Sequence, residues 1–340
     1  MKNTFRTCLS LLLLSLSLAI SGTARASQRP DETLNVPLVE AARKNDQAAL
    51  AKLLEGGAPV NGHDKVGDSA LVVAARGGCT ESVKLLLARG ADIKLRSWYG
   101  KLPLVEAARG GFVETAKQLV EAGANINLGD SEGRTALQVA AQRGDTKMVD
   151  FALSHGAKID LVDVAGATSL DLAAAQGQTE LVALLLKHGA SLKLRDRFDR
   201  SPLHYAAANA HVETVKLLIQ SGVDVKQRDK QGMTALHAAI DGAPGRPKPP
   251  LKGSDRVQDR IATVKLLMPA LPNLNMRTAD GETPLLIATE RGSLEMVAFL
   301  LSQKCDPNAR SAASNTILEI AQIKEYDDIA ALLKEAGAKK

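Results

Sequence analysis

A leucine that recurs at a constant interval constrains this 340-residue chain more than any other feature. The uninterrupted part of the series is Leu38, Leu71, Leu104, Leu137, Leu170, Leu203 and Leu236. The interval widens once, before Leu285, and returns to its first value at Leu318. Chains with a fixed period of about 33 residues fold as stacked units and need no single central core. The sequence therefore predicts nine units of one repeat, starting near residues 30, 63, 96, 129, 162, 195, 228, 277 and 310.

A glycine supports the same register, because it recurs at the same interval from Gly57 to Gly222. Within the fourth unit, Thr135 is placed to cap a short helix with an alanine-rich side, and Gly144 is placed to end it. A second, more continuously apolar helix follows in each unit, as at Val83–Leu87. Each unit is therefore predicted to be a helix–turn–helix.

Two segments, Asp196–His204 and Asp229–His237, carry the fullest form of the repeat: a short turn, then Ser-Pro-Leu-His or Thr-Ala-Leu-His. With the Gly-Ala pair that closes most units, this pattern resembles the ankyrin repeat. The resemblance covers residues 30–340 and implies an all-α solenoid of about nine helix–turn–helix units with β-turn fingers. Asp199 stands where the family has its turn glycine, and we expect it to adopt a left-handed backbone conformation.

The first 26 residues resemble a cleavable signal peptide. Lys2 and Arg6 form a basic head, Leu9–Ile20 is apolar, and a run of small residues ends at Ala26. A 12-residue helix spans about 18 Å, which is too short for a hydrocarbon core of about 30 Å. We therefore expect export, cleavage after Ala26, no stable membrane anchor, and a protein located in the periplasm or secreted.

The formal net charge of +5 belongs mostly to that signal peptide. Lys2, Arg6 and Arg25 leave with it, so the mature chain carries a net charge of +2. The overall basicity therefore gives no reason to expect a nucleic-acid partner.

Residues with catalytic or metal-ligating chemistry are few and scattered. The resemblance implies that His204 and His237 brace neighbouring loops by hydrogen bonds. Cys79 and Cys305 lie six units apart, and Cys305 takes a small buried position, so we expect neither a disulfide between them nor a nucleophile. No histidine has a second ligand at the spacing of a metal site. We expect no metal, no cofactor and no enzymatic activity.

Basic and aromatic side chains gather at the finger positions that the resemblance implies are exposed. Trp98 and Tyr99 are adjacent in a chain with a single tryptophan, and such residues are typical interface anchors. Neighbouring aspartates, which we expect to brace the turns, partly neutralise this row. The predicted partner-binding residues are Arg96, Trp98, Tyr99, Lys101, Arg109, Arg134, Arg195, Arg197, Phe198, Arg200, Arg228 and Lys230, and the later fingers add Arg277 and Arg310.

The single wide interval contains an insertion within 241–256, between the two helices of the seventh unit. Its prolines and glycines exclude regular helix over most of its length. Two interpretations stay open: a tolerated surface loop, and a polyproline II ligand formed by Pro244, Pro247 and Pro250.

These features favour a monomeric binding or scaffolding protein of the periplasm. Its concave face, formed by fingers and first helices, is expected to hold another protein with an acidic surface. The alternative is a secreted effector that engages a host protein, because a signal peptide indicates only export. An enzyme or a small-ligand-binding protein is a third reading, although the ankyrin architecture offers an open groove and not an enclosed pocket.

Overall fold

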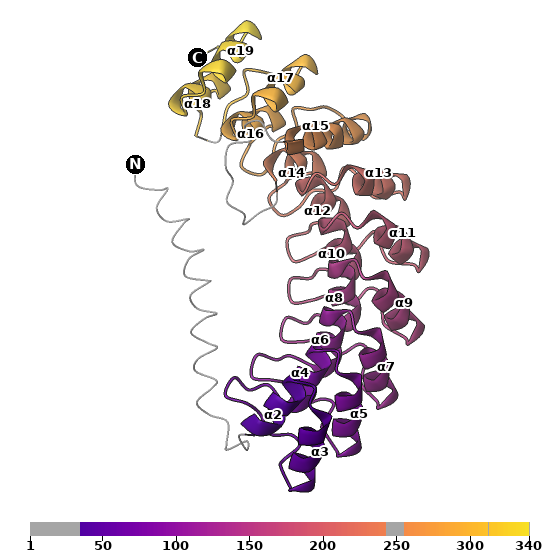
Figure 1. Cartoon of the computed structure of the whole chain (residues 1–340). Helices are drawn as coiled ribbons and strands as arrows, with labels where there is room; N and C mark the ends of the chain where they lie inside the picture. Colours follow the sequence, from indigo (N-terminus) through magenta and orange to yellow (C-terminus); the bar gives the residue numbers. More distant parts are fainter. Residues whose placement is uncertain (1–34, 243–254, 312, 340) are drawn as a thin grey trace. The chain divides into compact units, whose positions relative to one another are not determined.

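The computed structural model describes residues 35–242, 255–311 and 313–339 (Figure 1). These residues form 18 α-helices and one 3-10 helix, with no β-strand beyond two isolated bridges. The predicted signal peptide and most of the predicted insertion lie outside them. Among the helices described, none combines the length and the apolar character needed to cross a membrane.

The first compact unit spans residues 1–125, and its described part holds three repeats. First helices α2, α4 and α6 pack side by side, and second helices α3, α5 and α7 do the same (Figure 1). The bounds are α2 Val36–Arg43, α3 Gln47–Glu55, α4 Ala70–Arg76, α5 Thr80–Ala88, α6 Pro103–Gly110 and α7 Val113–Glu121.

The second compact unit spans residues 126–340 and holds six repeats of the same kind. Its first helices are α8 Ala136–Arg143, α10 Ser169–Ala175, α12 Pro202–Ala208, α14 Ala235–Asp241, α16 Pro284–Glu290 and α18 Ile317–Ile323. Its second helices are α9 Thr146–Ser154, α11 Thr179–Lys187, α13 Val212–Gln220, α15 Asp255–Leu267, α17 Leu294–Ser302 and α19 Asp327–Glu335, with a 3-10 turn at Met268–Ala270.

The leucine register forms the core, as the period predicts. Every leucine of the repeating series is at most 5% exposed. The predicted caps are confirmed as well: the Thr135 hydroxyl accepts from the backbone N–H of Gln138, and Gly144 ends α8 in a left-handed conformation. These local signals fix where α8 starts and ends.

The turn that precedes a first helix is called a finger here. The expected aspartate brace is present in five of the described fingers, at Asp64, Asp130, Asp163, Asp196 and Asp229, whereas Ser97 and Thr278 take that place in the third and eighth fingers. In the sixth repeat one carboxylate oxygen of Asp196 accepts from the backbone N–H groups of Phe198 and Arg200, both at 2.8 Å. Asp199 has a φ of 61°, which confirms the left-handed conformation expected there.

Backbone hydrogen bonds join each finger to the next along most of the second unit. We call this series the finger ladder. Its bonds are Val164 N–H to Glu132 O at 2.9 Å, Arg197 N–H to Ala165 O at 3.0 Å, Lys230 N–H to Phe198 O at 2.9 Å, and Ala279 N–H to Gln231 O at 2.8 Å. Since the ladder uses only main-chain atoms, the side chains at the finger tips remain available for other contacts.

The borders of the predicted insertion are helical. Asp241 is the last residue of α14, and Asp255 and Arg256 belong to α15, which has 13 residues where the other second helices have nine. Arg260 of this longer helix is buried and donates to the carbonyls of Ala239 and Ala208. The predicted absence of helix therefore does not extend to the two ends of the 241–256 segment.

Candidate functional site

Five of the predicted arginines stand at the start of a finger and donate to backbone carbonyls. They are Arg96, Arg195, Arg228, Arg277 and Arg310. Arg228, for example, reaches the carbonyl of Gly232 in its own finger at 2.6 Å and that of Arg277 in the next finger at 2.8 Å. These side chains therefore support the fingers, a structural role that the sequence did not reveal.

The tip of the third finger exposes two aromatic rings. Trp98 is 45% exposed and Tyr99 is 66% exposed. One side of Trp98 is supported by the preceding finger: its ring centroid lies 4.9 Å from that of His63, and its backbone N–H donates to the carbonyl of Gly67 at 3.3 Å. An indole fixed in this way keeps its remaining surface open to solvent, as an interface anchor requires.

An ionic network adjoins these rings through Lys101, whose Nζ lies 5.6 Å from the ring centroid of Tyr99 and 3.7 Å from a carboxylate oxygen of Asp68. Asp68 and Glu106 are almost fully buried, whereas the side chains of Arg76, Lys101 and Arg109 are between 35 and 41% exposed. Arg76 contacts Asp68 at 2.9 Å and Glu106 at 2.6 Å, while Arg109 contacts Glu106 at 3.1 Å. The outer layer is therefore cationic although the network is close to neutral. Together with Trp98 and Tyr99, these three cations form what we call the Trp98 surface.

The network also shifts the pKa of Arg76. Burial alone would lower the pKa of Arg76, but its bonds to Glu106 and Asp68 outweigh burial and raise the pKa. Sequence reasoning missed Arg76, Asp68 and Glu106. The repeat register could have identified Arg76, because this residue precedes the predicted Arg109 by one repeat period.

A second exposed aromatic side chain, Phe198, lies in the sixth finger and is 56% exposed. The guanidinium of Arg200 is held between two rings, 4.8 Å from the centroid of Phe198 and 4.8 Å from that of Tyr205. Asp196 fixes it from below through a bond of 2.7 Å and also accepts from the Tyr205 hydroxyl at 2.7 Å. Such a clamped cation has little side-chain entropy left to lose when a partner binds.

The Asp196 carboxylate is the buried centre of this arrangement. Burial alone would raise the pKa of Asp196, but the bonds from Tyr205 and Arg200 outweigh burial and lower it. The charge therefore persists under the exposed ring of Phe198.

Two other predicted cations, Arg197 and Lys230, have exposed side chains at neighbouring finger tips, and only their backbone N–H groups belong to the finger ladder. With Phe198, Arg200 and Tyr205 they form what we call the Phe198 surface. Arg134 is more enclosed, because it contacts Glu132 at 2.5 Å and lies 3.9 Å from Asp163. The structure thus gathers eight of the predicted residues into two surfaces, one on each compact unit, and uses the other predicted arginines within the fingers.

The histidines and cysteines have the structural roles expected of them. His204 and His237 lie within bonding distance of the carbonyls of Met233 and Met276 in the following repeats, at 3.2 and 3.0 Å. Cys305 is buried, which raises the pKa of its thiol to about 11, and both Cys305 and Cys79 are free thiols. Within the described ranges, no group of three or more histidine, cysteine or acidic residues is placed to hold a metal ion.

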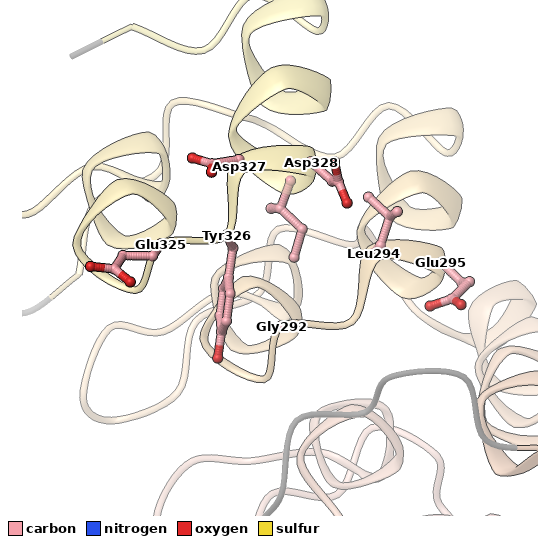
Figure 2. Close-up of a pocket in the computed structure, with 8 residues that line it drawn as sticks. Gly292, Leu294, Glu295, Glu325, Tyr326, Asp327 and Asp328 are labelled. Carbon is pink, nitrogen blue, oxygen red and sulfur yellow. The ribbon is translucent and has the colours of Figure 1, made fainter.

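An open pocket of about 380 Å³ lies near the C-terminal end of the second unit, between the starts of α17 and α19 (Figure 2). Figure 2 shows Leu294 and Tyr326 among carboxylates on several sides. Glu295, Asp327 and Asp328 occupy the first turns of the two helices, where acidic side chains stabilise the positive end of the helix dipole. Helix stability therefore accounts for the acidic lining.

Comparisons with known proteins agree with this geometry. The sequence model of the family described as ankyrin repeats (3 copies) matches residues 38–130, 104–196, 189–246 and 257–340. No curated protein matches the sequence. Among solved structures, the ankyrin repeat domain of human ASB11 is similar to this chain, with a TM-score of 0.58 and 28% sequence identity. That match covers 70% of this chain and 99% of the ASB11 chain.

Proposed function

The chain belongs to the ankyrin-repeat family, and we propose that it captures a partner protein on its Trp98 and Phe198 surfaces. Ankyrin repeats are generally protein–protein interaction modules and not catalytic scaffolds. The observation that carries the proposal is the exposure of Trp98, Tyr99 and Phe198 on fingers whose backbone is braced by hydrogen bonds. Exposed aromatic side chains on a rigid support are the residues that most often dominate binding energy.

The greater exposure of cations than of carboxylates in these surfaces supports an acidic partner. In the Trp98 surface the carboxylates of Asp68 and Glu106 are buried and the cations are more exposed, and in the Phe198 surface Asp196 is buried while Arg197 and Lys230 are exposed, beside the exposed carboxylate of Asp199. Arginine held in a fixed orientation pairs with carboxylates in a bidentate manner at small entropic cost. We therefore propose a folded partner with carboxylates around an apolar contact.

We further propose that the mature protein works as a monomer in the periplasm. The support for the location is the sequence of residues 1–26, with its basic head, short apolar stretch and Ala-Arg-Ala end. The alternative, a secreted effector that engages a host protein, shares that support. Cell fractionation separates the two, because recovery only from the culture medium would exclude the periplasmic role.

Capture from a periplasmic extract with immobilised mature protein tests the binding proposal. We expect the W98A/Y99A double variant or the R197E/K230E double variant to capture much less of the partner protein, because these substitutions remove or reverse side chains at exposed finger tips. The matched control is K187E/K216E, which reverses two exposed charges on the second helices α11 and α13 of the same unit as Arg197 and Lys230.

The proposal is wrong if K187E/K216E abolishes capture as completely as R197E/K230E does, since binding would then depend on net charge and not on the finger surface. It is also wrong if both finger variants retain the captured protein at the wild-type level.

A further inference from the structure

One buried polar residue stands at the same place in four consecutive first helices of the second unit. These residues are Gln138, Asp171, His204 and His237, each one repeat period from the next. All four are at most 2% exposed. Each lies in the first turn of its helix and exchanges hydrogen bonds with the Ser or Thr that caps it.

Three of these residues use a second polar atom to reach the following finger. The Gln138 side-chain NH₂ donates to the carbonyls of Leu161 at 3.1 Å and Ala167 at 2.9 Å. The Nδ1 atoms of His204 and His237 face the cap, and their Nε2 atoms face carbonyls of the next repeat. A nitrogen that faces a carbonyl must carry a proton, so all three side chains act as donors there.

Asp171 has the same cap but no nitrogen to continue the series. Its Oδ2 accepts from the N–H of Thr168 at 2.8 Å and from the Thr168 hydroxyl at 2.7 Å. Its Oδ1 is buried, and no donor among the described residues reaches it. An ionised carboxylate thus leaves a buried oxygen without a hydrogen-bond donor at the repeat position where the other three side chains supply a donor. Such a group is costly to bury.

The finger that follows Asp171 runs from Arg195 to Arg200 and is part of the Phe198 surface. The carbonyl of Leu194, at its start, is one period from the carbonyl of Leu161 that accepts from Gln138. Arg195 also donates to the Leu194 carbonyl, at 2.7 Å. A neutral carboxyl at position 171 has the O–H donor that this place in the repeat requires, and an ionised one has none.

We propose that Asp171 is a positioning residue that holds the Arg195–Arg200 finger in place while its carboxyl is protonated, and releases that finger when it ionises. The device is thus a proton switch placed under the exposed finger that carries Phe198. We also expect this release to weaken partner capture, and that expectation rests on the function proposed above.

The charged groups around Asp171 come from several elements. From the following finger, Asp196 disfavours the ionised form and Arg195 favours it. From α12, Tyr205 interacts electrostatically with Asp171, and burial lowers the pKa of the neighbouring His204. The charged residues of α8 and α11, which are Arg143, Glu180 and Lys187, are exposed to solvent.

The balance of these influences places the pKa of Asp171 near neutral pH. Burial raises the pKa of Asp171 to about 7, against the opposing effect of the bonds from Thr168. In an open finger the carboxyl would return to the ordinary range for aspartate, about 4. Between these two values the open form binds one proton fewer than the closed form, so the opening equilibrium rises about tenfold per pH unit.

Hydrogen exchange of the Arg197 amide, which bonds to Ala165 in the finger ladder, measures this opening directly. In the mature wild-type protein, after correction for the intrinsic pH dependence, we expect exchange to increase about tenfold per pH unit from pH 5 to 7 and to level off above. The Asp171→Asn variant carries an amide like that of Gln138, so we expect slow exchange that is independent of pH.

Glu319→Gln is the matched control, because Glu319 forms the same cap with Thr316 in the last described repeat, and the structure places no finger beyond it. We expect its Arg197 exchange profile to equal that of the wild type. An infrared band of a protonated carboxyl at pH 6 that Asp171→Asn lacks would support the same assignment without depending on exchange.

A flat wild-type profile, or the same pH dependence in Asp171→Asn as in the wild type, would overturn the proposal. If the Asp171→Asn variant fails to fold, the pH dependence of Arg197 amide exchange in the wild-type protein alone tests the proposal. If the finger opens as expected but capture does not change between pH 6 and 8, the switch stands and the Phe198 surface is not the binding site.

Discussion

Trp98 rests against Gly67 of the preceding finger, and this contact shows how one residue determines what another can expose. Gly67 has a φ of 78°, and a Cβ added to it would lie 2.1 Å from Cγ of Trp98. The glycine therefore does two things: it permits the turn, and it leaves room for the indole.

We expect Gly67→Ala to displace the Trp98 side chain and to cost roughly 2 kcal/mol of unfolding free energy, from backbone strain and from lost packing. Because Trp98 is the single tryptophan, its fluorescence maximum reports the displacement without interference. The control is Gly57→Ala, which has a similar φ of 82° and no atom within 4 Å of the added Cβ. Equal fluorescence shifts in the two variants would contradict the account.

A second residue-scale prediction concerns acid stability. The pKa of Asp196 in the folded protein lies below its ordinary value, so its contribution to stability is present above about pH 4 and is lost as the pH falls further. Tyr205→Phe removes one bond that lowers this pKa, so we expect acid unfolding to begin at a higher pH, as followed by circular dichroism. Tyr326→Phe, elsewhere in the same unit, should leave the acid midpoint unchanged.

At the scale of helices and fingers, local signals in the sequence predicted most of what forms. Thr135 and Gly144 mark the ends of α8 because a cap hydroxyl and a left-handed glycine satisfy terminal backbone groups in any context. The helical ends of the 241–256 segment were not predicted. The prolines and glycines that suggested a loop all lie before Asp255. From Asp255 onward helix is stabilised by the burial of Val257, Ile261 and Val264 in α15.

Arg260 on this longer helix links three elements, because it donates to Ala239 in α14 and to Ala208 at the end of α12. We expect Arg260→Met to lower the unfolding free energy by roughly 2 kcal/mol, since carbonyls at helix ends would lose a charged donor inside the protein. Urea unfolding measures the loss. Arg256→Met, which removes an exposed arginine of the same helix, is the control, and an equal loss there would disprove the role of Arg260.

At the scale of the whole molecule, the constant repeat period predicted a stack of nine units, and the resemblance of each unit to the ankyrin repeat implied the all-α class. The repeat period could not predict which finger cations donate hydrogen bonds to backbone carbonyls of the protein itself. Arg228 and Lys230 look equivalent in the sequence, yet the first donates to two backbone carbonyls and the second is exposed at a tip. That difference depends on the position of the next finger, which begins at Arg277 beyond the insertion, and not on local sequence.

The layered charges predict how capture responds to salt. Because the cations of the Trp98 and Phe198 surfaces are partly exposed, we expect raising NaCl from about 0.05 to about 0.5 M to weaken capture by the wild-type protein by about tenfold or more. The W98A/Y99A variant should show a similar salt dependence from a lower starting affinity, since it loses apolar contact and keeps the cations. Surface plasmon resonance with the captured protein would measure both, and affinity independent of salt would contradict an acidic partner.

The finger ladder also bears on how such a chain can evolve. Every bond of the ladder joins one main-chain N–H to one carbonyl of the preceding finger, irrespective of side chain. A duplicated repeat placed among the fingers of the second unit would therefore inherit a donor and an acceptor in register with its neighbours. Gene duplication could lengthen the surface by whole units, and substitutions at the tips could then diverge without disturbing the bonds beneath them.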